Sequence, residues 1–239
     1  MNTVERGRYR ARLADGLLDM DQVLWLRRVV FRGGRTTDQD RFDAGCRHLI
    51  VEEQSGQLVG CLRLQVCIGA EIEESYSAQF YDVTALSAFP EPMLEIGRFA
   101  LDPNRHDPDI LRLVWVALRQ VVDVGGIGML FGCSSFAGAE PQAHSNALAL
   151  LAERHLAPGH WRPSAKGPAF DFGRLLAGYP VAVETALAGL PPLLRSYLAL
   201  GGWVGGHAIS DHDLNTLHVF TAVEIAAIPA ARLRALRAL

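Results

Sequence analysis

The chain has 239 residues, 49% of them hydrophobic and 21% charged, which is the composition of an ordinary globular protein with one substantial domain. A formal net charge of -3 and a pI near 6.2 provide no overall basic field, which argues against a protein that lives on nucleic acid.

The beginning of the chain and the cysteines give information about its compartment. MNTVERGRYRAR lacks the apolar core of a signal peptide, and no run of about 18 uncharged apolar residues follows, so we expect a cytosolic chain. The cysteines have no CxxC spacing, so neither a zinc knuckle nor a disulfide framework is indicated. They are expected to be reduced and mostly buried: Cys46, Cys61, Cys67 and Cys133.

The basic residues are all arginines except Lys166. Near the N-terminus four of them recur at every second position, which would place them on one side of an extended strand: Arg6, Arg8, Arg10 and Arg12. This stripe is typical of a solvated strand face, and it would also suit an anionic lipid surface or an acidic protein.

The first predicted helix follows this strand. Residues 19–31 carry apolar side chains at intervals of three and four behind a possible cap, Asp19 or Asp21. Residues 33–45 then read as a polar loop whose acids sit where no core needs them: Asp38, Asp40 and Asp43.

The middle of the chain predicts a hairpin, a strand and a long helix. Residues 47–53 and 57–67 flank a short glycine-containing turn, and a short helix is expected near 73–81. MLEIGRFALD, residues 93–102, predicts a strand. The helix that follows would have Asp107 as its cap, Pro108 in its first turn and Gly125 at its end.

The remaining segments alternate between strand and helix. Residues 128–136, 169–176 and 217–225 predict strands, and 144–156 and 190–202 predict helices. The mixed order indicates an α+β fold with a central, partly parallel sheet and helices on both faces. We expect a single domain, 1–239.

Several site types find no support. No HExxH pair exists, and His207 with His212 reads as part of a glycine-flanked loop without a third ligand, so we expect neither a metal nor a cofactor. No histidine has an aspartate five positions later, as glycerolipid O-acyltransferases require. GCSSFAG is not GxSxG, and no Walker A or GxGxxG run occurs.

Glu95 and Arg98 are unusual inside an apolar strand. They would point to opposite faces unless a bulge intervened, and Gly97 between them could mark one. On one side of a cleft, the carboxylate could take a proton from an attacking amine while the arginine holds a carboxylate. A structural ion pair that ties the strand to a loop is the alternative.

A family resemblance extends this interpretation. The strand, capped helix and GMLFGCSSF strand resemble the middle of the GNAT N-acyltransferases, and the chain resembles their acyl-carrier-protein branch. One set of residues resembles the residue series of acyl-homoserine-lactone synthases in order and approximate spacing: Arg27, Phe31, Asp40, Asp43, Arg63, Glu95 and Arg98. DRFDAGCRHLIV, EIGRFALD, MLFGCSSF and the tail LPPLLRSYLALGGWVGGHAISDHDLNT are similar to the L-ornithine Nα-acyltransferases of ornithine-lipid synthesis, also called hemolysin-like acyltransferases.

The resemblance implies a reaction and a set of roles. A 3-hydroxyacyl chain would pass from acyl carrier protein to the α-amine of L-ornithine, giving lyso-ornithine lipid, and residues from about 180 to 239 would form a family-specific extension. Glu95 and Arg98 would be catalytic. Substrate would be bound by Arg27, Phe31, Asp40, Asp43, Arg63, Cys133, Ser134, Asp213 and Asn215. An inactive GNAT-like binding module and an acyl-homoserine-lactone synthase that uses S-adenosylmethionine remain the alternatives.

Three further features of the sequence concern the acyl donor and the membrane. NRHDPDI stands where acyl-CoA enzymes have a glycine-rich pyrophosphate turn, which favours a carrier-protein donor over CoA. Carrier proteins are acidic, so the docking candidates are Arg105, Arg112 and Arg119, with the N-terminal stripe. An amphiphilic product makes loose attachment to the cytoplasmic membrane face plausible, through residues that could equally be core: Leu190, Leu193, Leu194, Leu198 and Trp203.

Overall fold

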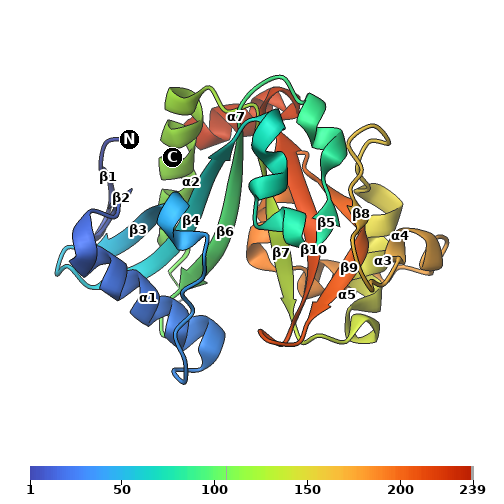
Figure 1. Ribbon diagram of the computed structural model, residues 1–239, viewed down its shortest axis with the longest axis horizontal. Helices are drawn as coiled ribbons and strands as arrows, with labels where there is room; N and C mark the ends of the chain where they lie inside the picture. The colour runs from blue at the N-terminus through green and yellow to red at the C-terminus, as the bar shows by residue number, and fades with distance from the viewer. Residues whose placement is uncertain (106, 238–239) are drawn as a thin grey trace. The chain divides into compact units, whose positions relative to one another are not determined.

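The computed structural model describes residues 1–105 and 107–237, and it divides into two compact units (Figure 1). Unit 1 contains residues 1–66, 94–127 and the C-terminal residues from Ala230. Unit 2 contains residues 67–93 and 128–229.

The sheet of unit 1 has the spatial order β1-β2-β3-β4-β6. Its strands are β1 (Val4–Arg6), β2 (Tyr9–Leu13), β3 (Arg47–Glu53), β4 (Leu58–Cys67) and β6 (Met93–Leu101). The predicted hairpin over β3 and β4 is present and antiparallel. The N-terminal segment is a hairpin rather than one strand, because Gly7 takes a φ of 57° and turns the chain so that Arg6 pairs with Tyr9.

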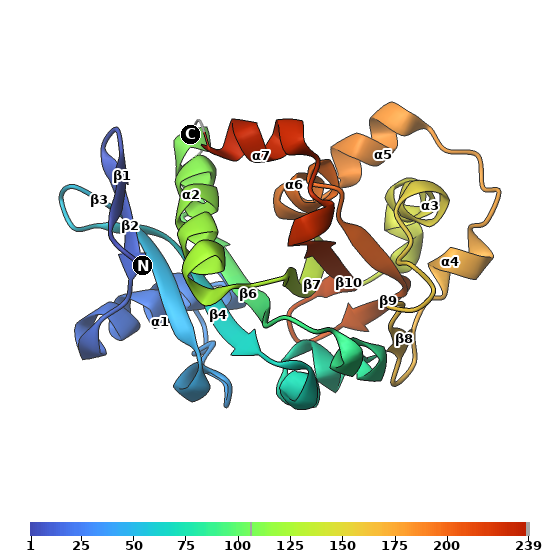
Figure 2. The ribbon, with the colours of Figure 1, turned by 90° about the horizontal axis from the view of Figure 1, so that it is seen from above.

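Two helices cover opposite faces of this sheet. On α1 (Gly16–Arg32), Val23 and Leu26 pack against Ile50, Cys61 and Ala100. Side chains alternate along a strand, so the neighbouring position Gly60 belongs to the other face, where a Cβ would meet Ile110 of α2 (Pro108–Gly125) at 3.6 Å. The C-terminal helix α7 (Ala230–Arg237) contacts α2 (Figure 2).

The ends of these helices test the predicted caps. Asp107 caps α2 as expected, accepting a hydrogen bond from the Asp109 amide at 3.0 Å, but the left-handed residue beyond the helix is Gly126 rather than Gly125. The cap predicted for α1 was wrong. That helix begins at Gly16, and the Asp19 carboxylate lies inside it, where it accepts from the Asp15 amide.

Unit 2 has the sheet β7-β10-β9, with β10 (Thr216–Glu224) paired antiparallel to β7 (Met129–Ala137) and β9 (Trp203–Asp211). Strand β9 was not predicted, because glycines at 201, 202, 205 and 206 gave the segment the composition of a loop. His207 therefore lies in a strand, not in the expected loop.

Helices cover one face of this sheet: α3 (Ser145–Arg154), α4 (Phe172–Leu175), α5 (Val183–Gly189) and α6 (Pro192–Ala199). The strand predicted over 169–176 was wrong. Only Phe170 makes a bridge to Ala208, and Asp171 then caps α4 by accepting from the Arg174 amide.

The other face of the sheet is covered by short 3-10 turns over 69–74, 77–79 and 84–88, in place of the helix expected near 73–81. With them lies the two-stranded ribbon of β5 (Tyr81–Asp82) and β8 (Ser164–Ala165). Of the apolar residues considered for membrane contact, Leu190, Leu194 and Trp203 are buried in these cores.

Candidate active site

The loop after α1 carries three aspartates that are held inside the protein rather than displayed on it. Asp38 is 1% exposed and Asp43 is 8% exposed, so the expectation of acids that no core needs was wrong for both. Ionised carboxylates can be buried only beside opposite charges. Arginines from three elements provide those charges.

Arg27 of α1 is fully buried and anchors both ends of this loop. Its Nε donates to Asp38 Oδ2 at 3.0 Å, and its Nη1 donates to Asp43 Oδ1 at 2.6 Å. Nη2 also donates to the backbone carbonyl of Asp38. Arg32, five residues further along α1, donates to Asp38 Oδ1 at 3.1 Å. Both arginines of α1 therefore bind the same aspartate of the loop.

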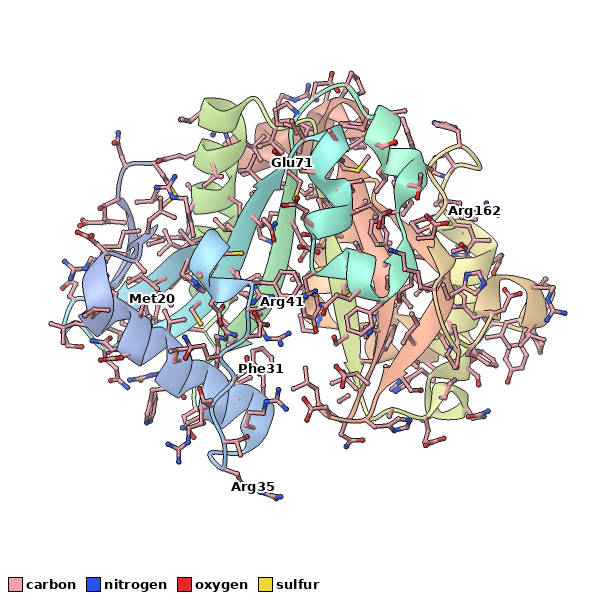
Figure 3. All side chains as sticks on the ribbon, viewed as in Figure 1. Met20, Phe31, Arg35, Arg41, Glu71 and Arg162 are labelled. Atoms are coloured by element: carbon pink, nitrogen blue, oxygen red, sulfur yellow. The ribbon has the colours of Figure 1, made fainter. Side chains whose placement is uncertain are left out.

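Arg98 of β6 marks the kink in the strand. Its φ is 50°, a left-handed conformation that is rare for a residue with a side chain, whereas Gly97, where the bulge was expected, has no positive φ. Arg98 Nε donates to Asp38 Oδ2 at 2.9 Å and Nη2 donates to Asp40 Oδ2 at 3.2 Å. Its guanidinium carbon also lies 5.9 Å from the ring centre of Phe31, a side chain labelled in Figure 3.

Arg63 of β4 completes the cluster, since its Nη1 donates to Asp40 Oδ1 at 2.5 Å and to Asp43 Oδ1 at 3.1 Å. Burial opposes the ionisation of Asp43, but hydrogen bonds and charge from Arg27, with the charge of Arg63, outweigh it and hold the pKa of Asp43 below its usual value. The carboxylate is therefore charged at neutral pH.

Glu95 lies in the same region of unit 1 and is 4% exposed. Burial raises the pKa of the Cys46 thiol to about 11, and the nearby charges of Glu95 and Asp43 add to the rise. Glu95 therefore lies near Cys46, as do Asp40 and Asp43. Four guanidinium groups and three aspartates form the cluster, and Glu95 lies in the same region of unit 1.

Three members of this region were missed as site residues. Arg32 and His48 carried no signal, and Asp38 was read only as a loop acid. His48 faces Arg63 across the β3–β4 pair, and its Nε2 lies 3.9 Å from Asp43 Oδ1. Burial is the main reason that its pKa is lowered, so the imidazole is neutral at pH 7. The spacing of Asp38 from Arg27 gave no hint of their contact.

The other predicted site residues belong to unit 2. Cys133 and Ser134 lie on β7, where Cys133 Sγ is 3.5 Å from Ser77 Oγ. Asp213 and Asn215 lie in the β9–β10 turn, with Asn215 at a φ of 49°. Asp211 accepts hydrogen bonds from the amides of residues 213 and 214, so the segment has the chemistry of a tight turn.

The arginines predicted to dock an acidic partner already have acidic neighbours. Arg105 lies 3.3 Å from Glu53, Arg112 lies 2.9 Å from Asp109, and Arg119 lies 3.3 Å from Asp123. The N-terminal stripe is paired as well, to Glu52, Glu53, Asp19, Asp107 and Asp109.

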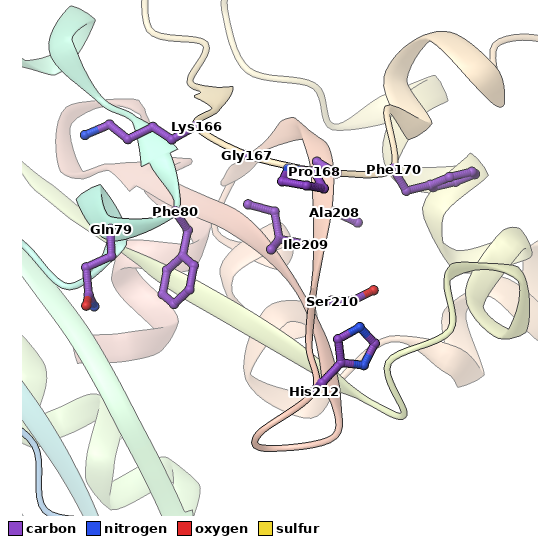
Figure 4. A pocket seen from close by; sticks show the side chains of 11 residues that line it. Gln79, Phe80, Lys166, Gly167, Pro168, Phe170, Ala208, Ile209, Ser210 and His212 are labelled. Carbon is purple, nitrogen blue, oxygen red and sulfur yellow. The ribbon is translucent and has the colours of Figure 1, made fainter.

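Unit 2 contains a cavity of about 600 Å³ (Figure 4). Phe80, Phe170 and Ile209 provide apolar walls, and Lys166 and His212 add polar groups to the lining. This volume and this mostly apolar lining are typical of sites that bind small molecules.

His218 lies beside this cavity, with its ring centre 4.7 Å from that of Phe80. Its Nδ1 lies 3.1 Å from the Tyr81 hydroxyl, and its Nε2 has no hydrogen-bond partner in the described part of the chain. Burial lowers the pKa of His218 from 6.5 to about 4, so the ring is neutral in the folded protein.

This shift predicts acid sensitivity. Because the folded pKa lies below the unfolded value of 6.5, unfolded chains bind the proton first, and stability falls as the pH drops from about 6.5 toward 4. The full effect is roughly 3 kcal/mol. His218→Phe should remove that part of the pH dependence, as measured by urea unfolding across this range. The exposed His212, replaced by Asn, should leave the dependence as in the wild type; equal slopes in all three proteins would contradict the assignment.

Within residues 1–105 and 107–237, no group of three or more His, Cys, Asp or Glu side chains is arranged to hold a metal ion. No helix in these ranges has the length and apolar character needed to cross a bilayer.

Comparison with known proteins places this architecture in a class. The acetyltransferase (GNAT) domain family matches residues 27–116, which include the C-terminal end of α1, the aspartate loop, β6 and the first half of α2. FeeM, an N-acyl amino acid synthase from uncultured soil microbes, superposes with a TM-score of 0.53 at 11% identity over 92% of each chain. The structure of TofI superposes with a TM-score of 0.51 at 14% identity over 95% of each chain. The protein has the GNAT N-acyltransferase fold, which confirms the predicted fold class.

Sequence relatives narrow the class to a family. L-ornithine N(alpha)-acyltransferase of Rhodobacter capsulatus is 33% identical over 80% of this chain and 76% of its own length. The enzyme of the same name from Brucella abortus is 32% identical over 79% of this chain and 70% of its own length. The chain belongs to the L-ornithine N(alpha)-acyltransferase family, as the resemblance in its motifs predicted.

Proposed function

We propose that this protein transfers a (3-hydroxy)acyl chain from acyl carrier protein to the α-amine of L-ornithine, forming lyso-ornithine lipid. The observation that carries the proposal is the 33% identity over 80% of the chain to the L-ornithine N(alpha)-acyltransferase of Rhodobacter capsulatus. Four relatives that are 30–33% identical to this chain all carry the name L-ornithine N(alpha)-acyltransferase.

The chemistry is a direct displacement. The neutral α-amine attacks the thioester carbonyl, a C–N bond forms, the C–S bond breaks, and the phosphopantetheine thiol leaves with a proton. Glu95 would accept the proton that the ammonium group must lose before attack. Backbone amides of β7 near Cys133 and Ser134 would face the oxygen on which negative charge develops.

The acceptor's other groups need partners of opposite charge. Among the three aspartates, Asp40 suits the δ-ammonium best, because its side chain is 23% exposed while those of Asp38 and Asp43 are 0% and 4% exposed. Arg98, 10% exposed, would meet the carboxylate of ornithine. Asp43 and Arg27 would act by fixing the loop, while Phe31 and Arg63 would position these contacting groups. Asp213 and Asn215 stay further candidates for the δ-ammonium.

The acyl chain has a candidate site in the cavity of unit 2. Phe80, Phe170 and Ile209 would pack along methylene groups. Ile209→Trp, which narrows the cavity, is expected to lower kcat/KM for long acyl donors more than for short ones, as measured with donors of graded length. An equal loss for all lengths would argue against this site for the chain.

The proposal also includes acyl carrier protein as the acyl donor and peripheral contact with the inner membrane. The donor is assigned to acyl carrier protein because of the turn before α2. There Asp107 and Asp109 stand where the pyrophosphate of CoA would need free backbone amides. Peripheral contact with the inner membrane would release an amphiphilic product where it partitions.

The test is a reconstituted reaction with pure protein. 3-Hydroxyacyl carrier protein or the matching acyl-CoA is supplied as donor, with ornithine, lysine, glycine or S-adenosylmethionine as acceptor, and products are identified by mass spectrometry. N-acylornithine from the carrier-protein donor is expected. A lactone product alone would identify a homoserine-lactone synthase, and no product from any pair would favour a binding module.

A further inference from the structure

The outward face of α1 carries large apolar side chains that are mostly exposed in the described part of unit 1. Leu17 is 84% exposed, Leu18 is 79% exposed and Trp25 is 62% exposed. At about 100° per residue these three positions fall within an arc of about 100° on one side of the helix. The opposite side carries Val23 and Leu26, which are buried against the sheet. The helix is therefore apolar on two faces, and only one is used in folding.

Two arginines on this surface have no acidic partner. Arg28, on the same side of α1, donates only to the backbone carbonyl of Gly34, at 2.6 Å. Arg35, just beyond the helix, projects away from the ribbon in Figure 3. Across the described ranges, neither guanidinium lies within ion-pair distance of a carboxylate, in contrast to Arg105, Arg112 and Arg119. Asp15 and Asp21 are the exposed acids beside them.

We propose that the outer face of α1, defined by Leu17, Leu18, Trp25, Arg28 and Arg35, docks on an anionic lipid bilayer. Exposed leucines insert between acyl chains, and an indole ring lies at the headgroup level with its N–H toward water. Unpaired arginines add attraction to lipid phosphates without first breaking an ion pair. This combination fits the surface of a bilayer better than an acidic protein. An acidic protein would be bound mainly by basic groups, and the two projecting leucines would contribute little.

The inference deepens the membrane contact suggested above, and its test does not depend on acyl transfer. Purified protein is mixed with vesicles of phosphatidylcholine alone or of phosphatidylcholine with phosphatidylglycerol, and the bound fraction is measured by flotation. Binding is expected at least about tenfold tighter to the anionic vesicles, and it should weaken with salt. Indole fluorescence should shift to the blue on binding. Trp25→Phe should abolish most of that shift, because Trp115 and Trp203 are already buried and Trp161 is partly buried against the core of unit 2.

Matched variants identify the surface. The triple replacement Leu17→Ser, Leu18→Ser and Trp25→Ser should reduce binding to anionic vesicles at least about tenfold. Arg28→Gln with Arg35→Gln should lower it about as much and should cancel the lipid preference. The controls are Val124→Ser, which removes an isolated apolar side chain that is 78% exposed on α2, and Arg112→Gln, which removes an arginine already paired with Asp109.

Three outcomes would overturn the proposal: no binding to either vesicle, equal loss in the controls, or wild-type binding by the triple variant. A triple variant that binds vesicles normally but loses affinity for acyl carrier protein would assign the face to that protein instead. N-acylornithine formation from lipid-free substrates is expected to be unchanged in the α1 variants and in Val124→Ser. A failure of vesicle binding can therefore be told apart from a failure of the proposed reaction.

Discussion

Glu95→Gln is expected to lower kcat for N-acylornithine formation by about 10²- to 10⁴-fold, the usual contribution of a positioned general base. Glutamine has nearly the same shape, so substrate should still bind and KM should change little. The loss is expected because the amide cannot accept the proton that the α-ammonium group must give up. Initial rates with saturating donor and graded ornithine provide the measurement.

A pH profile separates this role from a structural one. In the wild type, the rate should fall on the acidic side as the base becomes protonated, and in Glu95→Gln the residual rate should lack that fall. Glu95→Asp, which keeps the carboxylate but shortens its reach, should retain more activity than the glutamine variant. An unchanged kcat in Glu95→Gln would exclude the base role. So would equal losses in both variants with an unchanged pH profile.

Asp38→Ala is expected to cost about 3–5 kcal/mol of stability, the largest effect of any single change in the aspartate loop. Asp38 is 1% exposed and accepts from Arg27, Arg32 and Arg98. Removing its carboxylate leaves the buried guanidinium of Arg27 with the carboxylate of Asp43 and a backbone carbonyl, and it breaks the ion pair between Arg98 and the loop. A drop in the urea unfolding midpoint is the expected result.

The control for this change is Asp123→Ala on α2. Asp123 also faces an arginine, Arg119 at 3.3 Å, but its side chain is 61% exposed, so its loss should cost less than about 1 kcal/mol. If both variants unfold at the same urea concentration, the buried cluster contributes no more than a surface ion pair. Asp38→Asn, which keeps the volume, should have a stability between those of Asp38→Ala and Asp123→Ala and thereby separate charge from packing.

The sequence alone determined most of the strands and helices and the family. Apolar residues at intervals of two or of three and four located β3, β4, β6, α1 and α2, because those intervals follow from backbone geometry within one element. The motifs around Glu95 and in the C-terminal tail indicated the family. Local signals failed in two places: glycines caused β9 to be read as a loop, and residues 169–176, which contain α4, were read as a strand.

Tertiary structure decided which charged side chains pair with one another. Arg27 is separated from Asp38 by 11 positions and Arg98 by 60, so no local pattern shows that these side chains meet. The same holds for exposure: Leu17, Leu18 and Trp25 have the periodicity of a helix, but only the packed sheet shows that they lie on its outer side. Sequence spacing fixes the direction of a side chain within its own element. The partner that it meets depends on how distant segments pack, which is set by the burial of the whole core.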